Sequence, residues 1–363
     1  MTLTSLVETY GEQAVSAAGG LIIGLAFGFF AQRSRFCLRA AAVEFARGQL
    51  GSKLAVWIMV FATALTSTQL LIAGGYLDVS ETRQLAAQGS ISGAAIGGLM
   101  FGGGMVLARG CASRLLVLSA NGNLRALLSG LMFAVVAQAS YRGLLAPWRE
   151  AITNLWLIDG GASRDIMALT GSSTAVKLLW CSAWVIGAVF FAWRNGIRAG
   201  VIVGAIGAGL TIAVGWIFTY SLSQTAFTPV AIKSLTFSGP SADTLMFVLT
   251  GPDKGVSFDI ALVPGVFLGS FLSAALWREL KIEGFADGLS MRRYIIGATL
   301  MGFGAMLAGG CAVGAGVTGA SVFALTAWIV LTGMWLGAAL MDALVDRGAE
   351  AGAPQPLEGL RVP

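Results

Sequence analysis

Charged residues are scarce in this chain of 363 residues, because Asp, Glu, Lys and Arg together make up only 11% of it. A soluble domain carries about 25% of such residues, so the composition excludes an ordinary water-soluble fold. Histidine is absent, which removes the commonest metal ligand and the commonest proton relay at neutral pH. The four cysteines form neither a CxxC pair nor a metal-type spacing, and aromatic-basic clusters suited to nucleic acid are missing. We expect no metal, no cofactor and no nucleic-acid partner.

Apolar segments fill most of the chain instead, since 56% of the residues are hydrophobic and 50 are glycine. A transmembrane helix needs roughly 20 mostly apolar residues, and this criterion predicts an all-α polytopic membrane protein with about nine spans. The expected spans are at 14–32, 53–75, 91–108, 124–142, 174–193, 199–221, 257–277, 293–308 and 322–343. Acidic Glu8 and Glu12 precede the first of them, so we expect no cleavable signal peptide.

Three apolar stretches between these spans are too short to cross a bilayer. They cover 33–47, 110–121 and 310–321, and each contains one cysteine. Irregular backbone at membrane depth is tolerated only where it is buried in protein or lines a cavity. We therefore expect short or re-entrant helices packed inside the protein.

One apolar segment occurs twice, at 95–112 and again at 295–312. At an offset of 200, nine of the eighteen positions are identical. In the first copy these are Ile96, Gly97, Gly102, Gly104, Leu107, Ala108, Gly110, Cys111 and Ala112. A duplicated membrane segment that twice delivers a thiol to the same place is typical of a transport pathway built from two halves.

Lysine and arginine are distributed unevenly between the expected loops, and this bias predicts the orientation. Loops after the odd-numbered spans hold Arg33, Arg35, Arg39, Arg47, Lys53, Arg109, Arg114, Arg125, Arg194, Arg198, Arg278, Lys281, Arg292 and Arg293, whereas loops after the even-numbered spans hold seven such residues. The bias places the N-terminus outside and the C-terminus in the cytoplasm. The duplicated segments are spans 3 and 8, which then cross in opposite directions, so we expect an inverted repeat.

The expected organisation is one transmembrane domain with a 4+1+4 arrangement of spans. Within residues 1–343, repeat one covers about 14–142, a connecting helix covers 174–193, and repeat two covers about 199–343. A cytoplasmic tail at 344–363 follows, and its end from about residue 348 is expected to be disordered.

A weaker internal similarity agrees with the repeat. Ser34-Arg35-Phe36-Cys37 aligns with Leu235-Thr236-Phe237-Ser238 at an offset of 201, so Ser238 stands where Cys37 stands. The surrounding segment, 222–256, contains three prolines and several serines and glycines. We expect it to form a long outer loop, partly folded back.

The cysteines differ in their surroundings. Cys181, within LLWCSAW, is expected to be a small buried core residue. Cys37, Cys111 and Cys311 lie beside helix breaks, which packing alone explains poorly. A desolvated thiol stays protonated, so it offers a weak S–H donor to a soft anion. Several binding sites of moderate affinity in series suit ion conduction better than one site of very high affinity.

Glycines around the last thiol are further candidates for the pathway. Gly310 precedes it, and the run after it, with Gly314 and Gly316, formally matches GxGxxG. No strand precedes this run, which argues against dinucleotide binding. Its backbone N–H groups could face an anion, with hydroxyl donors from Thr318 and Ser321, or its glycines could serve close helix packing. For Gly97, Gly102, Gly103 and Gly104 and their repeat partners we favour packing.

Arginines near the thiols are candidates for a cytoplasmic funnel, because a dianion inside a membrane needs positive charge or helix N-termini. The candidates are Arg35, Arg39, Arg109 and Arg114, although arginine at the membrane face also serves topology. Glu44 and Arg47 are three residues apart and are expected to form a surface ion pair.

The chain resembles the YeeE/YedE family of bacterial membrane proteins, also called the sulfur-transport family. The resemblance rests on RSRFC around Cys37, on GxGxxLARGCASR ending at Arg114, and on GxGxxLAGGCAVGAGVTG ending at Gly319, and it extends over about 18–342. It implies thiosulfate uptake across the inner membrane for cysteine synthesis, through an hourglass-shaped fold with short central helices. It also implies that the three cysteines beside the helix breaks pass the ion by S–H contacts. Relatives often act with a small TusA-like sulfur-carrier protein, here expected to be a separate chain.

We therefore expect a transporter for thiosulfate or a related small sulfur anion rather than an enzyme. The ion would meet Cys311 from the outer side and then pass Cys111 and Cys37. A membrane thiol–disulfide oxidoreductase or persulfide sulfurtransferase is the alternative, which the missing CxxC and missing histidine disfavour. A subunit that only anchors a partner is a third possibility.

Overall fold

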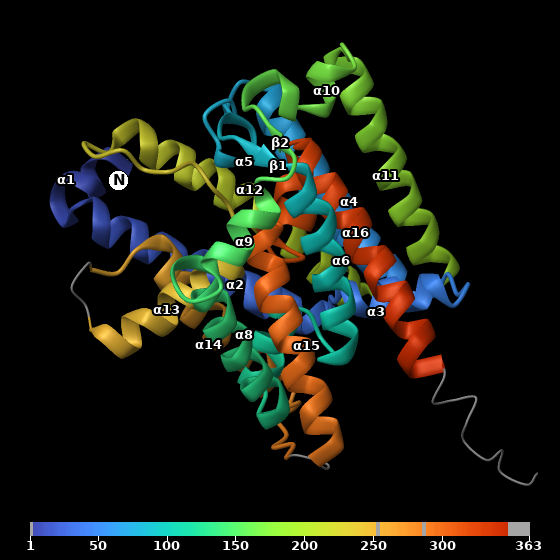
Figure 1. Ribbon diagram of the computed structural model, residues 1–363. Helices are drawn as coiled ribbons and strands as arrows, with labels where there is room; N and C mark the ends of the chain where they lie inside the picture. Colours follow the sequence, from blue (N-terminus) through green and yellow to red (C-terminus); the bar gives the residue numbers. More distant parts are fainter. Residues whose placement is uncertain (1–2, 252–254, 285–287, 348–363) are drawn as a thin grey trace, which may run out of the picture.

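The computed structural model describes residues 3–251, 255–284 and 288–347, which are helical almost throughout (Figure 1). The longer helices are α2 (Glu12–Ser34), α4 (Ser52–Ala73), α6 (Ile91–Leu107), α8 (Leu124–Arg142), α11 (Thr174–Arg194), α12 (Ala199–Thr225), α14 (Phe258–Leu276), α15 (Gly288–Leu307) and α16 (Leu325–Met341). The shorter elements are α1 (Leu3–Tyr10), α3 (Leu38–Ala46), α5 (Arg83–Ala86), α7 (Ala112–Ala120), α9 (Ala146–Thr153), η1 (Gly161–Arg164), α10 (Ile166–Leu169), α13 (Ser238–Thr250), η2 (Gly314–Gly319) and η3 (Asp342–Asp346). The two strands β1 (Gly89–Ser90) and β2 (Leu157–Ile158) form one antiparallel pair. The protein is thus an all-α polytopic membrane protein.

Eight helical segments of the described residues are long and apolar enough to span a membrane, one fewer than expected. They correspond to eight of the nine predicted spans. The ninth, predicted at 293–308, lies in α15, which has 20 residues but carries Arg292 and Arg293 near its start. These two charges lower the mean hydropathy of α15, which explains why it is not among the eight segments that are apolar enough to span a membrane. The short elements α3, α7 and η2 confirm the short helices predicted at the cysteines.

Repeated glycines let α6 and α15 cross in close contact. A Cβ atom on Gly97 would lie 2.7 Å from the carbonyl oxygen of Gly304, and one on Gly104 would lie 2.6 Å from that of Gly297. Gly297 and Gly304 are the repeat partners of Gly97 and Gly104, so the contact is reciprocal. Small residues allow this approach of backbones in membranes, and the packing interpretation of these glycines is confirmed.

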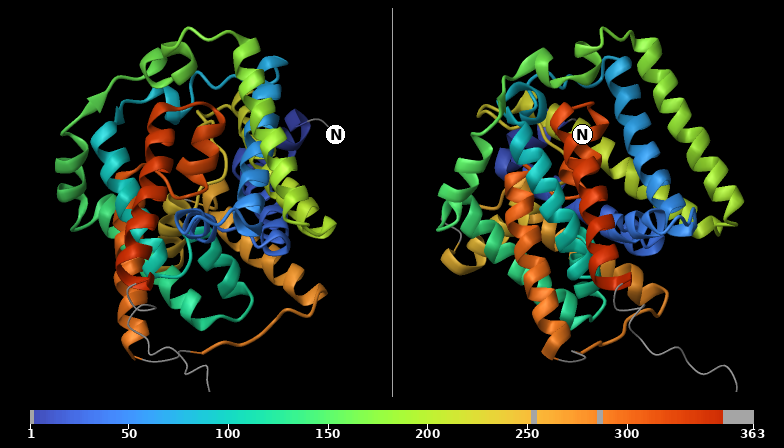
Figure 2. Two further views of the ribbon diagram at one scale, coloured as in Figure 1. Left: turned by 90° about the vertical axis from the view of Figure 1, so that its right-hand side faces the viewer. Right: turned by 45° about the vertical axis from the view of Figure 1, so that its right-hand side comes forward.

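Helices from the N-terminal and C-terminal halves of the chain pack mainly against each other. In the first half, α2 contacts α14 and α12, and α4 contacts α12. Likewise α6 contacts α16 and α15, and α8 contacts α15. By contrast, α11 stands at the edge beside α4 and is mostly exposed (Figures 1 and 2). The core therefore lies between the two halves.

Two boundaries differ from the sequence predictions. Within the predicted outer loop at 222–256, α12 continues to Thr225 and α13 forms a helix of 13 residues after an irregular segment at 226–237. The predicted tail at 344–363 begins too early, because η3 runs to Asp346. Its helical turn persists because Asp342 and Asp346 are held by arginines of other helices. Residues 348–363, where disorder was expected, lie outside the described residues.

Candidate thiol and arginine site

A left-handed residue precedes each of the three cysteines by two positions. Arg35, Arg109 and Gly309 have φ values of 55°, 56° and 75°, respectively. This conformation ends the preceding helix and turns the chain so that the cysteine starts the next short element. Cys37 and Cys111 are the N-cap residues of α3 and α7. Each thiol is thus placed at a helix N-terminus, where the helix dipole and free N–H groups favour anions.

Cys37 and Cys111 form a pair, although 74 positions separate them in the sequence. Their thiols lie within hydrogen-bonding reach of each other. Cys111 is fully buried, and its Sγ atom lies 3.5 Å from Oγ of Ser113. The N-termini of two short helices therefore meet at two sulfhydryl groups, and we call Cys37, Cys111, Ser113 and Arg114 the inner site.

Arg114 supplies positive charge to the inner site. It is the third residue of α7, and its Nη1 atom is buried with no hydrogen-bond partner. Its electrostatic neighbours are the two thiols of the inner site together with Arg35 and Glu279. No carboxylate of the described residues forms an ion pair with it. A buried charge is normally paired, so this guanidinium has room for an anionic ligand.

Cys311 belongs to a second cluster, which we call the outer site. Its Sγ atom accepts hydrogen bonds from the backbone N–H of Phe237, at 3.4 Å, and of Gly314, at 3.5 Å. Ser238 is the first residue of α13, and its Oγ atom lies 3.5 Å from Oγ1 of Thr236. Ser238, which aligns with Cys37, directly follows Phe237, the residue whose N–H donates to the thiol of Cys311.

Close packing accounts for Gly310 and Gly314 of the outer site, but not for Gly316. A Cβ atom on Gly314 would lie 2.1 Å from Oγ1 of Thr236, and one on Gly310 would lie 2.8 Å from the backbone nitrogen of Ala315. At Gly316 a Cβ atom would meet only a leucine methyl group at 3.4 Å. Gly314 also donates its N–H to the thiol, so at this position packing and polar contact occur together.

Thr318 and Ser321 do not offer free hydroxyl protons to a ligand, contrary to the prediction. Thr318 Oγ1 donates to the carbonyl oxygen of Leu235 at 2.7 Å, and Ser321 Oγ donates to that of Thr318 at 2.7 Å. Ser321 Oγ also accepts from Nε1 of Trp216 at 3.3 Å. Buried hydroxyls bond to nearby carbonyls where these lack partners, and here they hold η2 in place.

The two sites differ in charge. At the repeat offset of 200, Arg114 of the inner site corresponds to Gly314 of the outer site. The outer site therefore has a thiol, hydroxyls and backbone groups, whereas the inner site has two thiols and a guanidinium. Arg109 does not contribute to this charge, because its side chain is exposed.

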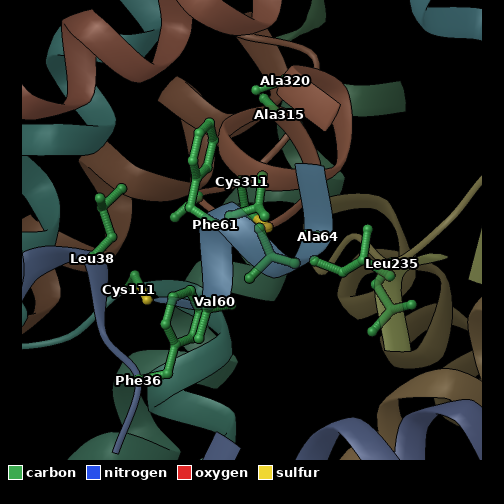
Figure 3. Packing of buried hydrophobic residues seen from close by; sticks show 14 of the residues in the cluster. Phe36, Leu38, Val60, Phe61, Ala64, Cys111, Leu235, Cys311, Ala315 and Ala320 are labelled. Atoms are coloured by element: carbon green, nitrogen blue, oxygen red, sulfur yellow. The ribbon is translucent and has the colours of Figure 1, made fainter. Parts of the chain in front are cut away.

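Apolar side chains surround the two buried sulfur atoms. Cys111 and Cys311 belong to one hydrophobic cluster with Val60, Phe61 and Leu235 (Figure 3). Both cysteines are at most 1% exposed. These two thiols are therefore closed to solvent in this arrangement, whereas Cys37 is half-buried.

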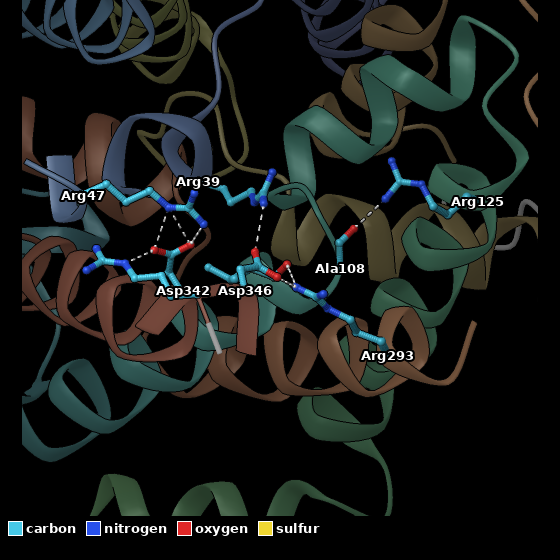
Figure 4. Close-up of polar contacts among 9 residues, drawn as sticks. Arg39, Arg47, Ala108, Arg125, Arg293, Asp342 and Asp346 are labelled. Carbon is cyan, nitrogen blue, oxygen red and sulfur yellow. Dashed lines mark hydrogen bonds and ion pairs between the residues drawn. The ribbon is translucent and has the colours of Figure 1, made fainter. Parts of the chain in front are cut away.

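Two ion clusters fix α3, whose N-cap residue is Cys37 (Figure 4). Asp342 is fully buried and accepts from Arg47, at 2.8 Å, and from Arg347, at 3.0 Å. Asp346 is paired with arginines from α3 and α15, namely Arg39 at 3.5 Å and Arg293 at 2.5 Å.

These clusters correct the predicted pair of Glu44 and Arg47. Arg47 bonds to Asp342, whereas Oε2 of Glu44 accepts from the backbone N–H of Leu54 at 2.8 Å. Arg39, expected in a funnel, holds α3 to the end of the C-terminal helix instead. The partners of Arg39 and Arg47 lie about 300 positions away in the sequence, so spacing along α3 could not reveal them.

Sequence reasoning missed Gln32 and Glu279. Oε2 of Glu279 accepts from Nε2 of Gln32 at 2.7 Å, and its Oε1 lies 3.4 Å from Nη2 of Arg35. These contacts join the end of α2 to the segment after α14, next to Arg114. The one sequence signal for Glu279 is its place just after the predicted span 257–277, in a chain that has only 18 acidic residues.

Comparison with known proteins adds an independent observation. The sequence model of the family described as "Sulphur transport" matches residues 33–340. The chain is 27% identical over 335 residues to "Thiosulfate transporter TsuA" of Escherichia coli (strain K12), covering 88% of this chain and 91% of that protein. It is also 27% identical over 328 residues to "Thiosulfate transporter TsuA" of Spirochaeta thermophila, covering 85% of this chain and 93% of that protein.

Proposed function

Since the chain belongs to the sulphur-transport family, we propose that it takes up thiosulfate, or a closely related small sulfur anion, across the bacterial inner membrane. Two relatives that share most of its length are named thiosulfate transporters. The observation that supports this function best is the inner site, where two thiols at helix N-termini lie beside a buried arginine with an unpartnered N–H. These groups together can receive a small anion that has left water.

In the proposed pathway the ion first meets Cys311 and Ser238 of the outer site and then reaches the inner site. There Cys37 and Cys111 act together, because their sulfur atoms are neighbours. Each thiol donates S–H to the anion and stays neutral, so no covalent bond has to form. Weak donors hold the ion for a short time, as conduction requires. The closed apolar region between the sites excludes water and other solutes.

The orientation belongs to the same proposal. With the N-terminus outside and the C-terminus in the cytoplasm, the inner site and Glu279 face the cytoplasm, where Arg35 and Glu279 are in contact with solvent. The two halves, about 14–142 and 199–343, then form an inverted repeat around the α6–α15 crossing. A separate TusA-like sulfur carrier would collect the anion on the cytoplasmic side.

Growth with thiosulfate as the sole sulfur source tests the pathway. Cys37→Ala, Cys111→Ala and Cys311→Ala are each expected to abolish growth, whereas Cys181→Ala is the matched control with normal growth, since Cys181 is buried in the edge helix α11. Purified protein in liposomes should take up labelled thiosulfate without any partner. Normal growth of all three pathway variants would refute the thiol relay.

Mass spectrometry separates transport from the enzymatic alternative. After exposure to thiosulfate, we expect the three cysteines to carry no added sulfur. A lasting persulfide, or a disulfide required for each cycle, would favour a sulfurtransferase or an oxidoreductase.

A further inference from the structure

Glu279 contacts Arg35, which lies two residues before Cys37 of the inner site, and its position is fixed by both backbone and side chain. It follows α14 and the left-handed Arg278, and its N–H donates to the carbonyl oxygen of Ala274 at 2.8 Å. Its carboxylate contacts Gln32 and Arg35, which lie where α2 ends and the chain turns toward Cys37. A negative charge is thus held at the end of the helix that leads to the inner site.

The exposures order these groups from the interior to the surface. Nη1 of Arg114 is buried, the side chain of Glu279 is 29% exposed, and that of Arg35 is 70% exposed. An anion that leaves Arg114 toward this surface therefore passes the carboxylate and then meets a second guanidinium. The charges of Arg35 and Glu279 both act on Arg114.

A buried guanidinium creates a problem for transport, because an anion that binds it tightly is released slowly. A nearby carboxylate reduces this difficulty by repelling the anion and by competing for the same N–H groups. In the present arrangement Glu279 is held by Gln32 and Arg35, so the carboxylate does not occupy Arg114. Gln32 itself is only partly satisfied, since its Oε1 is buried without a partner.

We propose that Glu279 is the release residue of the inner site, an inference that rests on the proposed anion transport. The carboxylate leaves Arg35 and Gln32 and pairs with Arg114, while the anion moves to the exposed guanidinium of Arg35. The two anionic groups exchange partners, no covalent bond changes, and each guanidinium keeps a counter-charge. Gln32 holds the carboxylate back until the anion has arrived.

The release role of Glu279 predicts that thiosulfate affinity and the maximal rate of uptake change in opposite directions when its charge is removed. Glu279→Gln keeps the size of the side chain and removes its charge, so thiosulfate should bind roughly tenfold or more tightly to the purified full-length protein. Maximal uptake into liposomes should fall by a similar factor, because release becomes slow. Glu279→Asp should restore both values toward normal. The control is Glu150→Gln, since Glu150 is exposed and pairs with its neighbour Arg149.

The variant Gln32→Ala tests the same role even if Glu279→Gln does not fold. Gln32→Ala frees the carboxylate but keeps its charge, so it should weaken thiosulfate binding. Reduced uptake of Glu279→Gln with unchanged affinity would mean that Glu279 only joins α14 to α2, and it would overturn the release role. Absence of thiosulfate uptake by the unsubstituted protein would instead refute the proposed function.

Discussion

Replacing Arg114 with glutamine gives the sharpest test of the inner site, because affinity and stability should respond differently. Nη1 of its guanidinium is buried without a hydrogen-bond partner, two thiols are its neighbours, and Arg114 forms no ion pair among the described residues. A hydrogen bond to a charged group contributes about 1.5–3 kcal/mol. Loss of this contact should therefore weaken thiosulfate binding roughly ten- to hundredfold, since about 1.4 kcal/mol is a factor of ten.

Stability of the protein without ligand should remain unchanged or increase in the Arg114→Gln variant. The buried Nη1 atom has left water without gaining a hydrogen-bond partner, which carries a desolvation cost, and glutamine reduces that cost. We would measure thiosulfate binding by calorimetry and thermal unfolding without ligand on the same purified samples. A structural role for Arg114 predicts the opposite pattern, a lower Tm with unchanged affinity.

Arg109→Gln is the matched control for this experiment. Arg109 also lies near the thiols in sequence, but its side chain is exposed, so affinity should stay close to that of the unsubstituted protein. Equal affinity in the Arg114 and control variants would refute the assignment of Arg114 to anion binding. Adding thiosulfate should raise the Tm of the control, because a ligand stabilises the state that binds it.

Three further predictions concern packing and ion pairs. Gly104→Val should prevent assembly of the α6–α15 crossing, because a Cβ atom would lie 2.6 Å from a backbone oxygen; gel filtration would show loss of monodisperse protein. Asp342→Asn removes the buried carboxylate that accepts from Arg47 and Arg347 and should lower stability by about 1.5–3 kcal/mol, the contribution of a hydrogen bond to a charged group, seen as a lower Tm. Gly314→Ala should abolish uptake through collision with Thr236, whose Oγ1 would lie 2.1 Å from the new Cβ atom; Thr236→Gly in the same chain should restore part of it.

Local sequence patterns were sufficient to predict most of the membrane helices and the helix ends beside the cysteines. The apolar runs predicted eight spans correctly, because length and composition decide whether a helix can cross a bilayer. The repeat around Cys111 and Cys311 predicted equivalent positions: Cys111 is the N-cap residue of α7, and Cys311 lies three residues before η2. The repeated glycines predicted close helix packing, because small residues at regular spacing let the backbones of two membrane helices approach each other.

Tertiary structure alone decided which of these positions meet. It paired Cys37 with Cys111 and placed the thiol of Cys311 against the N–H of Phe237. It also brought Glu279 to the end of α2, 244 positions from Arg35.

Such contacts depend on how helices from distant parts of the chain rotate and cross. Periodicity within one helix carries no information on that geometry. The sequence by itself therefore determined where the thiols lie along the chain, whereas packing between the two halves determined which charges and hydroxyls surround them.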